Sequence, residues 1–277
     1  MNTGAAPSGA IRTAVDATPH FMKLTGQGLF NFFGGLAILF VLWGIGIQFI
    51  AYSPATAHFA DFGPIPALRA IATMWEEGAI QRGIFSSGYR LGAGLLIAIA
   101  IGVPVGILMG RSRMFRELSN SPFQLMRMIS PLSWEPIAVI VFAGWDQAII
   151  FLIAIASVWP VTFATAAGLA KVDPAWFKVA RNLGASRWHV LTQIIVPAIT
   201  FDVLTGFRLA LGVAWIVIVP AEFFGVTSGL GYAIEDAREG LNYDHLMAMV
   251  LVIGAIGYIL DSFIVQLIKR YSWHRQA

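Results

Sequence analysis

The chain has 277 residues, of which 57% are hydrophobic and only 12% are charged. Together with a mean hydropathy of +0.74, this composition is typical of a protein embedded in a lipid bilayer and argues against a soluble globular domain. The absence of cysteine excludes disulfides, thiolate metal sites and a cysteine nucleophile. The net charge of +3 is not gathered into a basic domain, so nothing indicates nucleic-acid binding.

In chain order, residues 1–28 are predicted to form a flexible tail, residues 29–270 one all-α transmembrane domain, and residues 271–277 a C-terminal tail. A helix needs about 20 apolar residues to cross a bilayer, and five stretches meet this length: residues 32–50, 91–110, 147–170, 194–221 and 246–268. A sixth span is predicted over residues 118–142. Because it contains Arg127, Glu135 and three prolines, we expect its helix to be interrupted.

Two shorter amphipathic elements are predicted between the spans. Residues 65–89 have helical apolar spacing and are expected to lie along the membrane surface, and residues 226–242 resemble a second such element.

The distribution of basic residues predicts the topology, because short basic loops stay on the cytoplasmic side. With six spans and cytoplasmic termini, that side holds twelve of the 18 basic residues: Arg12, Lys23, Arg111, Arg113, Arg116, Lys171, Lys178, Arg181, Arg187, Lys269, Arg270 and Arg275. The opposite side carries most of the acidic residues. We therefore expect a multi-pass protein with both termini in the cytoplasm.

Between spans four and five lies a basic segment, residues 173–197, which we call the elbow. Asp173 followed by Pro174 is typical of a helix start. Gly184 is placed to end this helix, and Ser186 is placed to cap the next turn through His189. A helix–turn–helix at about residues 174–189 is therefore predicted on the cytoplasmic side.

The elbow resembles the conserved loop of binding-protein-dependent ABC transporter permeases, with Gly184, Ile194 and Pro197 at the family spacing. It departs from that loop at Lys178 and Val179. Further segments resemble the nitrate, sulfonate, taurine and bicarbonate branch of these permeases: residues 86–110 (SSGYRLGAGLLIAIAIGVPVGILMG), 130–136 (SPLSWEP), 182–188 (NLGASRW), 206–215 (GFRLALGVAW) and 221–234, which end in GLGYAI.

This resemblance implies a type I importer permease fold with about six transmembrane helices, in a bacterial cytoplasmic (inner) membrane. It implies a second permease copy in a homodimer, two cytoplasmic ATP-binding subunits, and a periplasmic or lipid-anchored solute-binding protein. ATP and Mg²⁺ would belong to the partner ATPase, since none of the four lysines of this chain follows a glycine in a phosphate-binding loop. The chain itself would be non-catalytic, with no metal and no cofactor.

The elbow is then expected to be the coupling helix that contacts the ATPase. The residues assigned to that contact are Lys178, Ala180, Arg181, Gly184, Ala185, Arg187 and Trp188. For Trp188 the alternative is an interfacial membrane anchor.

Charged and aromatic residues within the spans are the candidates for the translocation pathway: Arg127, Trp134, Glu135, Trp159, Arg208, Trp215 and Glu222. Arginines suit a small oxyanion such as nitrate, bicarbonate or a sulfonate. The alternative for Arg127 and Arg208 is pairing with Glu135, Asp202 or Asp261 to hold helices together. Gly102 and Gly106 have the spacing of a close helix crossing.

Other classes of function remain open on composition alone. An ion-coupled secondary transporter or channel would require an inverted repeat, and none is apparent. An intramembrane enzyme has no support, because the histidines are scattered and no serine lies in a nucleophile elbow.

Overall fold

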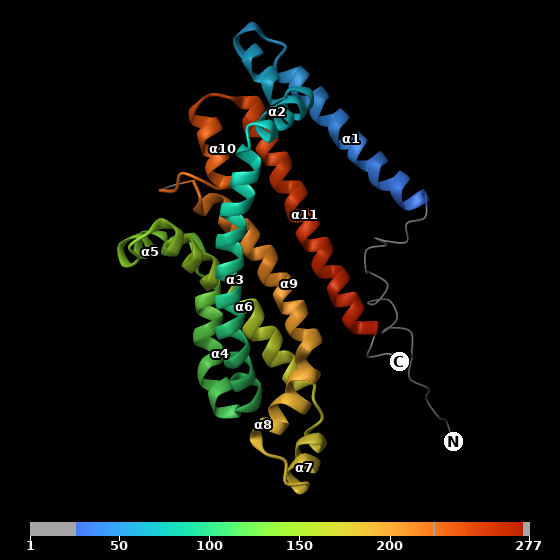
Figure 1. Ribbon diagram of the computed structural model, residues 1–277, viewed down its shortest axis with the longest axis vertical. Coiled ribbons are helices and arrows are strands. Elements are labelled where there is room, and N and C mark those ends of the chain that lie inside the picture. The colour runs from blue at the N-terminus through green and yellow to red at the C-terminus, as the bar shows by residue number, and fades with distance from the viewer. Residues whose placement is uncertain (1–25, 224, 274–277) are drawn as a thin grey trace, which may run out of the picture. The chain divides into compact units, whose positions relative to one another are not determined.

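The computed structural model describes residues 26–223 and 225–273, and within these residues every regular element is a helix (Figure 1). This confirms the predicted all-α fold. Residues 1–25 and 274–277, most of the two predicted tails, lie outside the described residues. The chain divides into two compact units, residues 1–64 and 65–277. In the first unit, α1 (Gly26–Ile50) is followed by the 3₁₀ helix η1 (Pro54–Phe62).

The second unit contains the other long helices and the elbow. It begins with α2 (Pro64–Glu76). The elements that come after α2 are, in chain order, α3 (Ala79–Arg111), α4 (Arg113–Met128), the 3₁₀ turn η2 (Pro131–Trp134), α5 (Glu135–Val141), α6 (Trp145–Ala170), α7 (Pro174–Asn182), α8 (Arg187–Val190), the π-helical turn η3 (Leu191–Ile195), α9 (Val196–Ala221), α10 (Leu230–Glu239) and α11 (Tyr243–Trp273).

Among the described residues, five helices are long and apolar enough to cross a membrane: Phe30–Ile50, Ala79–Arg111, Trp145–Ala170, Arg187–Ala221 and Tyr243–Arg270. They correspond to the five uninterrupted spans predicted. The predicted sixth span is broken, as expected, into α4, η2 and α5. Pro131 and Pro136 lie at the N-terminal ends of η2 and α5, where the missing N–H groups leave no helical hydrogen bond unmade.

The central packing joins α3 to α6 through glycines. A Cβ atom added at Gly94 would lie 2.5 Å from Ile153, one at Gly102 3.0 Å from Val161, and one at Gly106 2.6 Å from Thr165. The backbones thus approach so closely that no side chain fits, as predicted for Gly102 and Gly106. Because the contacted residue number rises with the glycine number, α3 and α6 run parallel, and residues 112–144 must return across the bundle.

Between α6 and α9 the contacts follow the opposite order, because residue numbers on one helix fall as those on the other rise. Gly168 of α6 contacts Asp202 of α9, and Gly206 of α9 contacts Ala164 of α6, so these helices run antiparallel. Helix α11 is antiparallel to α9, since Arg208 pairs with Asp261 and Trp215 packs on Gly257. The apolar core between α3, α6 and α9 includes Leu95, Ile153, Val161, Ala210 and Ile218.

The prediction of one surface helix over residues 65–89 is wrong. Gly78, with φ +72°, ends the first helical segment, and residues from Ala79 onward form the first turns of α3. The reason is that Ser87 and Arg90 are buried against other helices and do not face water. A helix in the second predicted element is confirmed: α10, with bounds inside residues 226–242.

Candidate functional site

The elbow has the local structure that its sequence predicts. The Asp173 carboxylate accepts a hydrogen bond of 2.8 Å from the Ala175 N–H at the start of α7. Gly184 adopts φ +71°, a left-handed conformation that costs other residues free energy. The Ser186 hydroxyl accepts from the His189 N–H at 3.2 Å and caps α8. Each such cap contributes about 1 kcal/mol, which helps two short helices to form.

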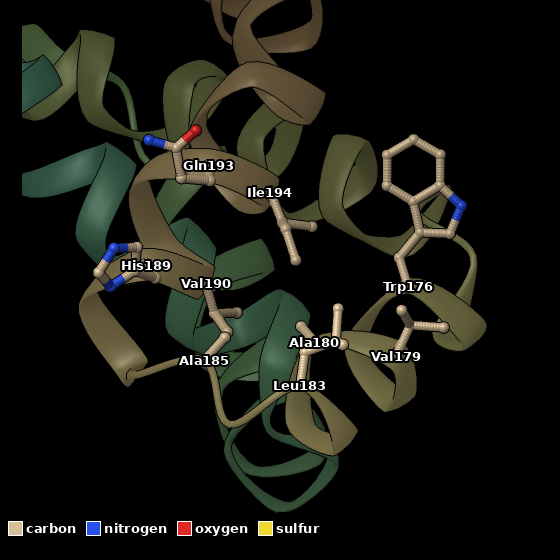
Figure 2. Close-up of a pocket in the computed structure, with 9 residues that line it drawn as sticks. All are labelled: Trp176, Val179, Ala180, Leu183, Ala185, His189, Val190, Gln193 and Ile194. Atoms are coloured by element: carbon tan, nitrogen blue, oxygen red, sulfur yellow. The ribbon is translucent and has the colours of Figure 1, made fainter.

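An apolar groove of about 510 Å³ lies between α7 and the α8–η3 segment. We call it the elbow groove, and its lining residues are Trp176, Val179, Ala180, Leu183, Ala185, His189, Val190, Gln193 and Ile194. In Figure 2, Ile194 from η3 points toward Ala180 on α7. Apolar side chains on its rim are largely exposed, 61% for Trp176 and 81% for Leu183. Large apolar groups exposed together beside polar residues make the elbow groove a candidate interaction surface.

Two of the predicted coupling residues, Ala180 and Ala185, line the elbow groove. The other five, Lys178, Arg181, Gly184, Arg187 and Trp188, are exposed around it and do not line it. The prediction missed Trp176, Val179 and Leu183. Their spacing of three and four residues places them on one face of α7, and this periodicity was readable in the sequence.

A second cavity, of about 280 Å³, opens where the sixth span is broken. This central cavity is lined by Met126, Arg127, Ile129, Pro131, Trp134, Ile155, Ala156, Trp159, Pro160 and Val213. It therefore brings together three predicted pathway residues from α4, η2 and α6. The Arg127 guanidinium stacks on the Phe163 ring at 5.4 Å and has no carboxylate partner within the described part of the chain.

The remaining predicted pathway residues lie elsewhere. Glu135 follows Trp134 at the start of α5 and is half-buried. Arg208 donates two hydrogen bonds to Asp261, of 2.7 and 2.9 Å. Of the two roles considered for Arg208, the structure therefore supports an ion pair that holds helices together. Trp215 packs between α9 and α11. Asp202 pairs with Lys171 at 2.6 Å.

Glu222 belongs to a buried polar network at the end of the bundle away from the elbow. We call this network the distal cluster: Ser87, Arg90, Asp146, Glu222 and Ser228. The Glu222 side chain is 0% exposed and that of Arg90 is 4% exposed. Arg90 donates to Glu222 at 2.6 Å, to Asp146 at 2.7 Å and to the Ser228 carbonyl at 2.7 Å.

The distal cluster also holds the start of α10. The Gly231 N–H donates to Glu222 at 3.0 Å, and the Leu230 N–H donates to the Ser87 hydroxyl at 2.8 Å. That hydroxyl lies 2.8 Å from one Glu222 oxygen and 2.9 Å from the other. Glu222 thus caps the N-terminus of α10, where a negative charge is favoured by the helix dipole. A Cβ at Gly229, which has φ +136°, would collide with the Glu222 carboxylate.

The distal cluster has a signal in the sequence that the predictions missed. Arg90 and Asp146 directly precede predicted spans and Glu222 directly follows one, so the predicted topology places all three on the non-cytoplasmic side. Opposite charges at one depth of a bundle are expected to pair. Farther along α10, the negative charge of Asp236, together with partial burial, raises the pKa of the Tyr232 hydroxyl above its ordinary value. Tyr232 therefore stays protonated and donates to Asp236 at 3.3 Å.

Comparison with known sequences gives consistent matches over most of the chain. Residues 102–275 match the family described as "Binding-protein-dependent transport system inner membrane component". The bicarbonate transport system permease protein CmpB of Synechococcus elongatus is 36% identical over 195 residues, covering 68% of this chain and 70% of that protein. The taurine transport system permease protein TauC of Escherichia coli is 35% identical over 207 residues, covering 74% and 73%.

Comparison with solved structures supports the same fold. A chain of the MetNI methionine ABC transporter, in an inward facing conformation, aligns with a TM-score of 0.61 and 15% identity, covering 72% of this chain and 98% of that one. A chain of an amino acid ABC transporter aligns with a TM-score of 0.56 and 18% identity, covering 73% and 97%. At these identities the alignments establish the fold.

Proposed function

Because this chain belongs to the family of binding-protein-dependent transport system inner membrane components, we propose that it is the membrane permease of an ATP-driven importer of a small anion. The chain is a multi-pass inner membrane protein with the type I importer fold. The elbow groove carries the proposal, since it is a preformed apolar surface that the single chain leaves uncovered.

In this proposal the elbow is the coupling helix, and an ATP-binding subunit inserts an apolar side chain into the elbow groove. Burying an exposed leucine or tryptophan contributes about 1.5–3 kcal/mol, and a few such residues dominate a typical interface. Because α7 and α8 are held by their own caps, movement of the bound ATPase would shift the elbow as a unit. The basic residues around the groove, Lys178, Arg181 and Arg187, would steer the approach of an acidic partner surface.

Substitution at the groove rim tests this proposal. Leu183→Glu places a charge at the groove rim and is expected to abolish ATP-driven uptake and stimulation of the partner ATPase. Asn182→Glu adds the same charge on the neighbouring exposed residue, outside the groove, and is expected to retain at least half of the activity. Equal losses in the two variants, or normal coupling in Leu183→Glu, would overturn the assignment.

The translocation pathway is proposed to pass the central cavity. Arg127 supplies a cation without a carboxylate partner in the described residues, and Trp134 and Trp159 supply apolar walls. Glu135 lies next to this cavity in sequence and half-buried at the break of the span. We assign Arg208, Trp215 and Glu222 to the framework, because their contacts join helices.

The solute is proposed to be a small oxyanion such as nitrate, bicarbonate or a sulfonate. The support is the Arg127 guanidinium, which has no carboxylate partner among the described residues and whose planar donors match such groups, and the similarity to permeases named for bicarbonate and taurine. The test is uptake by the reconstituted transporter of labelled bicarbonate and taurine. Arg127→Gln should reduce anion uptake at least tenfold while ATPase association stays normal, and Arg127→Lys should restore part of it. Undiminished uptake in Arg127→Gln would refute a role for Arg127.

The remaining parts of the assembly follow from the same proposal. A second copy of the chain would complete the pathway as a homodimer, a solute-binding protein would deliver the anion on the distal side, and two ATPases would hold ATP and Mg²⁺. The N- and C-termini would lie in the cytoplasm. Cysteine labelling tests this orientation, because the chain has no native cysteine: Asn182→Cys should react with a membrane-impermeant maleimide only in inside-out vesicles, and Glu239→Cys only in right-side-out ones.

A further inference from the structure

Two arginines from distant parts of the chain face one cavity beside the elbow. The cavity has a volume of about 430 Å³ and is lined by Ile107 and Arg111 of α3, Arg187 of α8, and Leu191 and Ile195 of η3. It is distinct from the elbow groove and from the central cavity, with which it shares no lining residue.

The described part of the chain does not neutralise the charges at this cavity. Within the described residues, neither Arg111 nor Arg187 forms an ion pair, whereas nearby Arg113 pairs with Glu117 and Lys171 with Asp202. The Arg111 guanidinium lies over the Phe177 ring at 5.5 Å, which fixes its position without cancelling its charge. Two cations beside one cavity repel each other, and an anion between them removes that cost.

The depth of the cavity matches the headgroup layer of a bilayer. The apolar part of α3, residues 91–110, is long enough to cross a hydrocarbon core of about 30 Å, and Arg111 follows directly after it. Arg187 likewise comes just before the apolar segment that runs through α9. Both guanidinium groups therefore stand where lipid phosphates lie, on the membrane face of the elbow.

The lining also selects an amphipathic occupant. Ile107, Leu191 and Ile195 give the cavity an apolar wall next to its two cations. A free inorganic anion would leave that wall uncovered, whereas the glycerol and upper acyl chains of a phospholipid would cover it. Basic pockets between transmembrane helices on the cytoplasmic side commonly bind anionic headgroups.

We propose that Arg111 and Arg187 bind the headgroup phosphate of one anionic phospholipid. This inference goes beyond the proposed transport function and rests on it for the cytoplasmic position of the elbow. The bound lipid would bridge the end of α3 to η3, the turn of the elbow that precedes α9, and would hold the elbow at a fixed height relative to the membrane.

Titration of short-chain lipids against the purified transporter with its ATPases, read out by native mass spectrometry, tests the proposal. The probes are dihexanoyl phosphatidylglycerol, dihexanoyl phosphatidylcholine and inorganic phosphate. We expect phosphatidylglycerol to bind at least tenfold more tightly than either of the other two. The double variant Arg111→Gln/Arg187→Gln should reduce its affinity at least tenfold.

The matched control is Arg113→Gln/Arg116→Gln, which removes two exposed arginines of the same region that do not line the cavity. It should change the affinity less than twofold. Arg111→Lys/Arg187→Lys keeps both charges and should retain measurable preference for phosphatidylglycerol. Equal loss in both glutamine variants, equal binding of phosphatidylcholine, or equally tight binding of inorganic phosphate would each overturn the proposal.

Discussion

The two ends of α9 are built on opposite principles. At the distal end, Arg90 and Glu222 are almost completely buried, and each charge is satisfied by hydrogen bonds within the chain. At the elbow end, the apolar side chains of Trp176 and Leu183 are mostly exposed, and their contacts are incomplete. The helix between them has 26 residues and is about 39 Å long.

This difference indicates where the chain is finished and where it requires a partner. A buried charge network is stable only when every member is paired, so the distal cluster describes a completed structural joint between α3, α9 and α10. A large exposed apolar patch rimmed by polar residues is typical of an interaction site, so the elbow groove is the proposed interface. Substitutions at the first site should therefore change the stability of the chain, and substitutions at the second should change assembly.

The largest effect is expected for Glu222→Gln. The amide keeps the shape but removes the buried carboxylate partner of Arg90 and leaves it only the largely exposed Asp146, and removal of one member of a buried pair typically costs about 3–5 kcal/mol. The free energy of unfolding, measured by denaturant titration in detergent, should fall by this amount. Glu239→Gln, on the exposed end of α10, should change it by less than about 0.5 kcal/mol. Similar values for the two variants would contradict the structural role of Glu222.

A pair of glycines should give effects of opposite sign. In Gly231→Ala the new methyl group would lie 2.8 Å from the Glu222 Cβ and press on the Val219 carbonyl, so a loss of about 1–3 kcal/mol of stability is expected. At Gly212, in the middle of α9, nothing lies within 4 Å of an added Cβ, and alanine should stabilise the helix by up to about 1 kcal/mol. The same unfolding titration measures both. Destabilisation by Gly212→Ala as large as that by Gly231→Ala would show that the distal site is not specially packed.

Two exposed tryptophans test the elbow end. Trp176 lines the elbow groove and Trp188 does not, although they are 61% and 69% exposed. Trp176→Ala should weaken association with the ATPase at least tenfold, a loss of about 1.4 kcal/mol, without lowering the free energy of unfolding. Trp188→Ala should weaken association less than threefold, in keeping with a membrane anchor. Copurification with a tagged ATPase and a binding titration report both values, and a stronger effect of Trp188 would restore it as a coupling contact.

The sequence predicted what depends on local rules and missed what depends on side-chain partners. The caps at Asp173 and Ser186, the turn at Gly184 and the break between α4 and α5 follow from residue types at fixed spacing, and all are observed. The pair Arg90–Glu222, whose residues are 132 apart in sequence, was missed, and Arg208–Asp261, whose residues are 53 apart, was only one of three pairings left open. Assigning these pairs requires the register between helices. Glycine contacts set the register of α3 against α6, and a single sequence does not show which neighbour such a glycine faces.

The smallest effect is expected for a charge pair that neither end requires. Arg113 pairs with Glu117 at 2.7 Å on α4, and their side chains are 84% and 62% exposed. Water and salt screen such a pair, so Arg113→Ala should change the free energy of unfolding by about 0.5 kcal/mol or less, and raising the salt concentration should remove even that. The N–O distance of this ion pair equals that between Arg90 and Asp146. A small effect of Arg113→Ala beside a large effect of Glu222→Gln would therefore show that burial, and not bond length, distinguishes the distal cluster. An effect of several kcal/mol at Arg113 would mean that the α4 surface is covered in the folded protein, and the comparison between the two ends would then have to include a second interface beside the elbow.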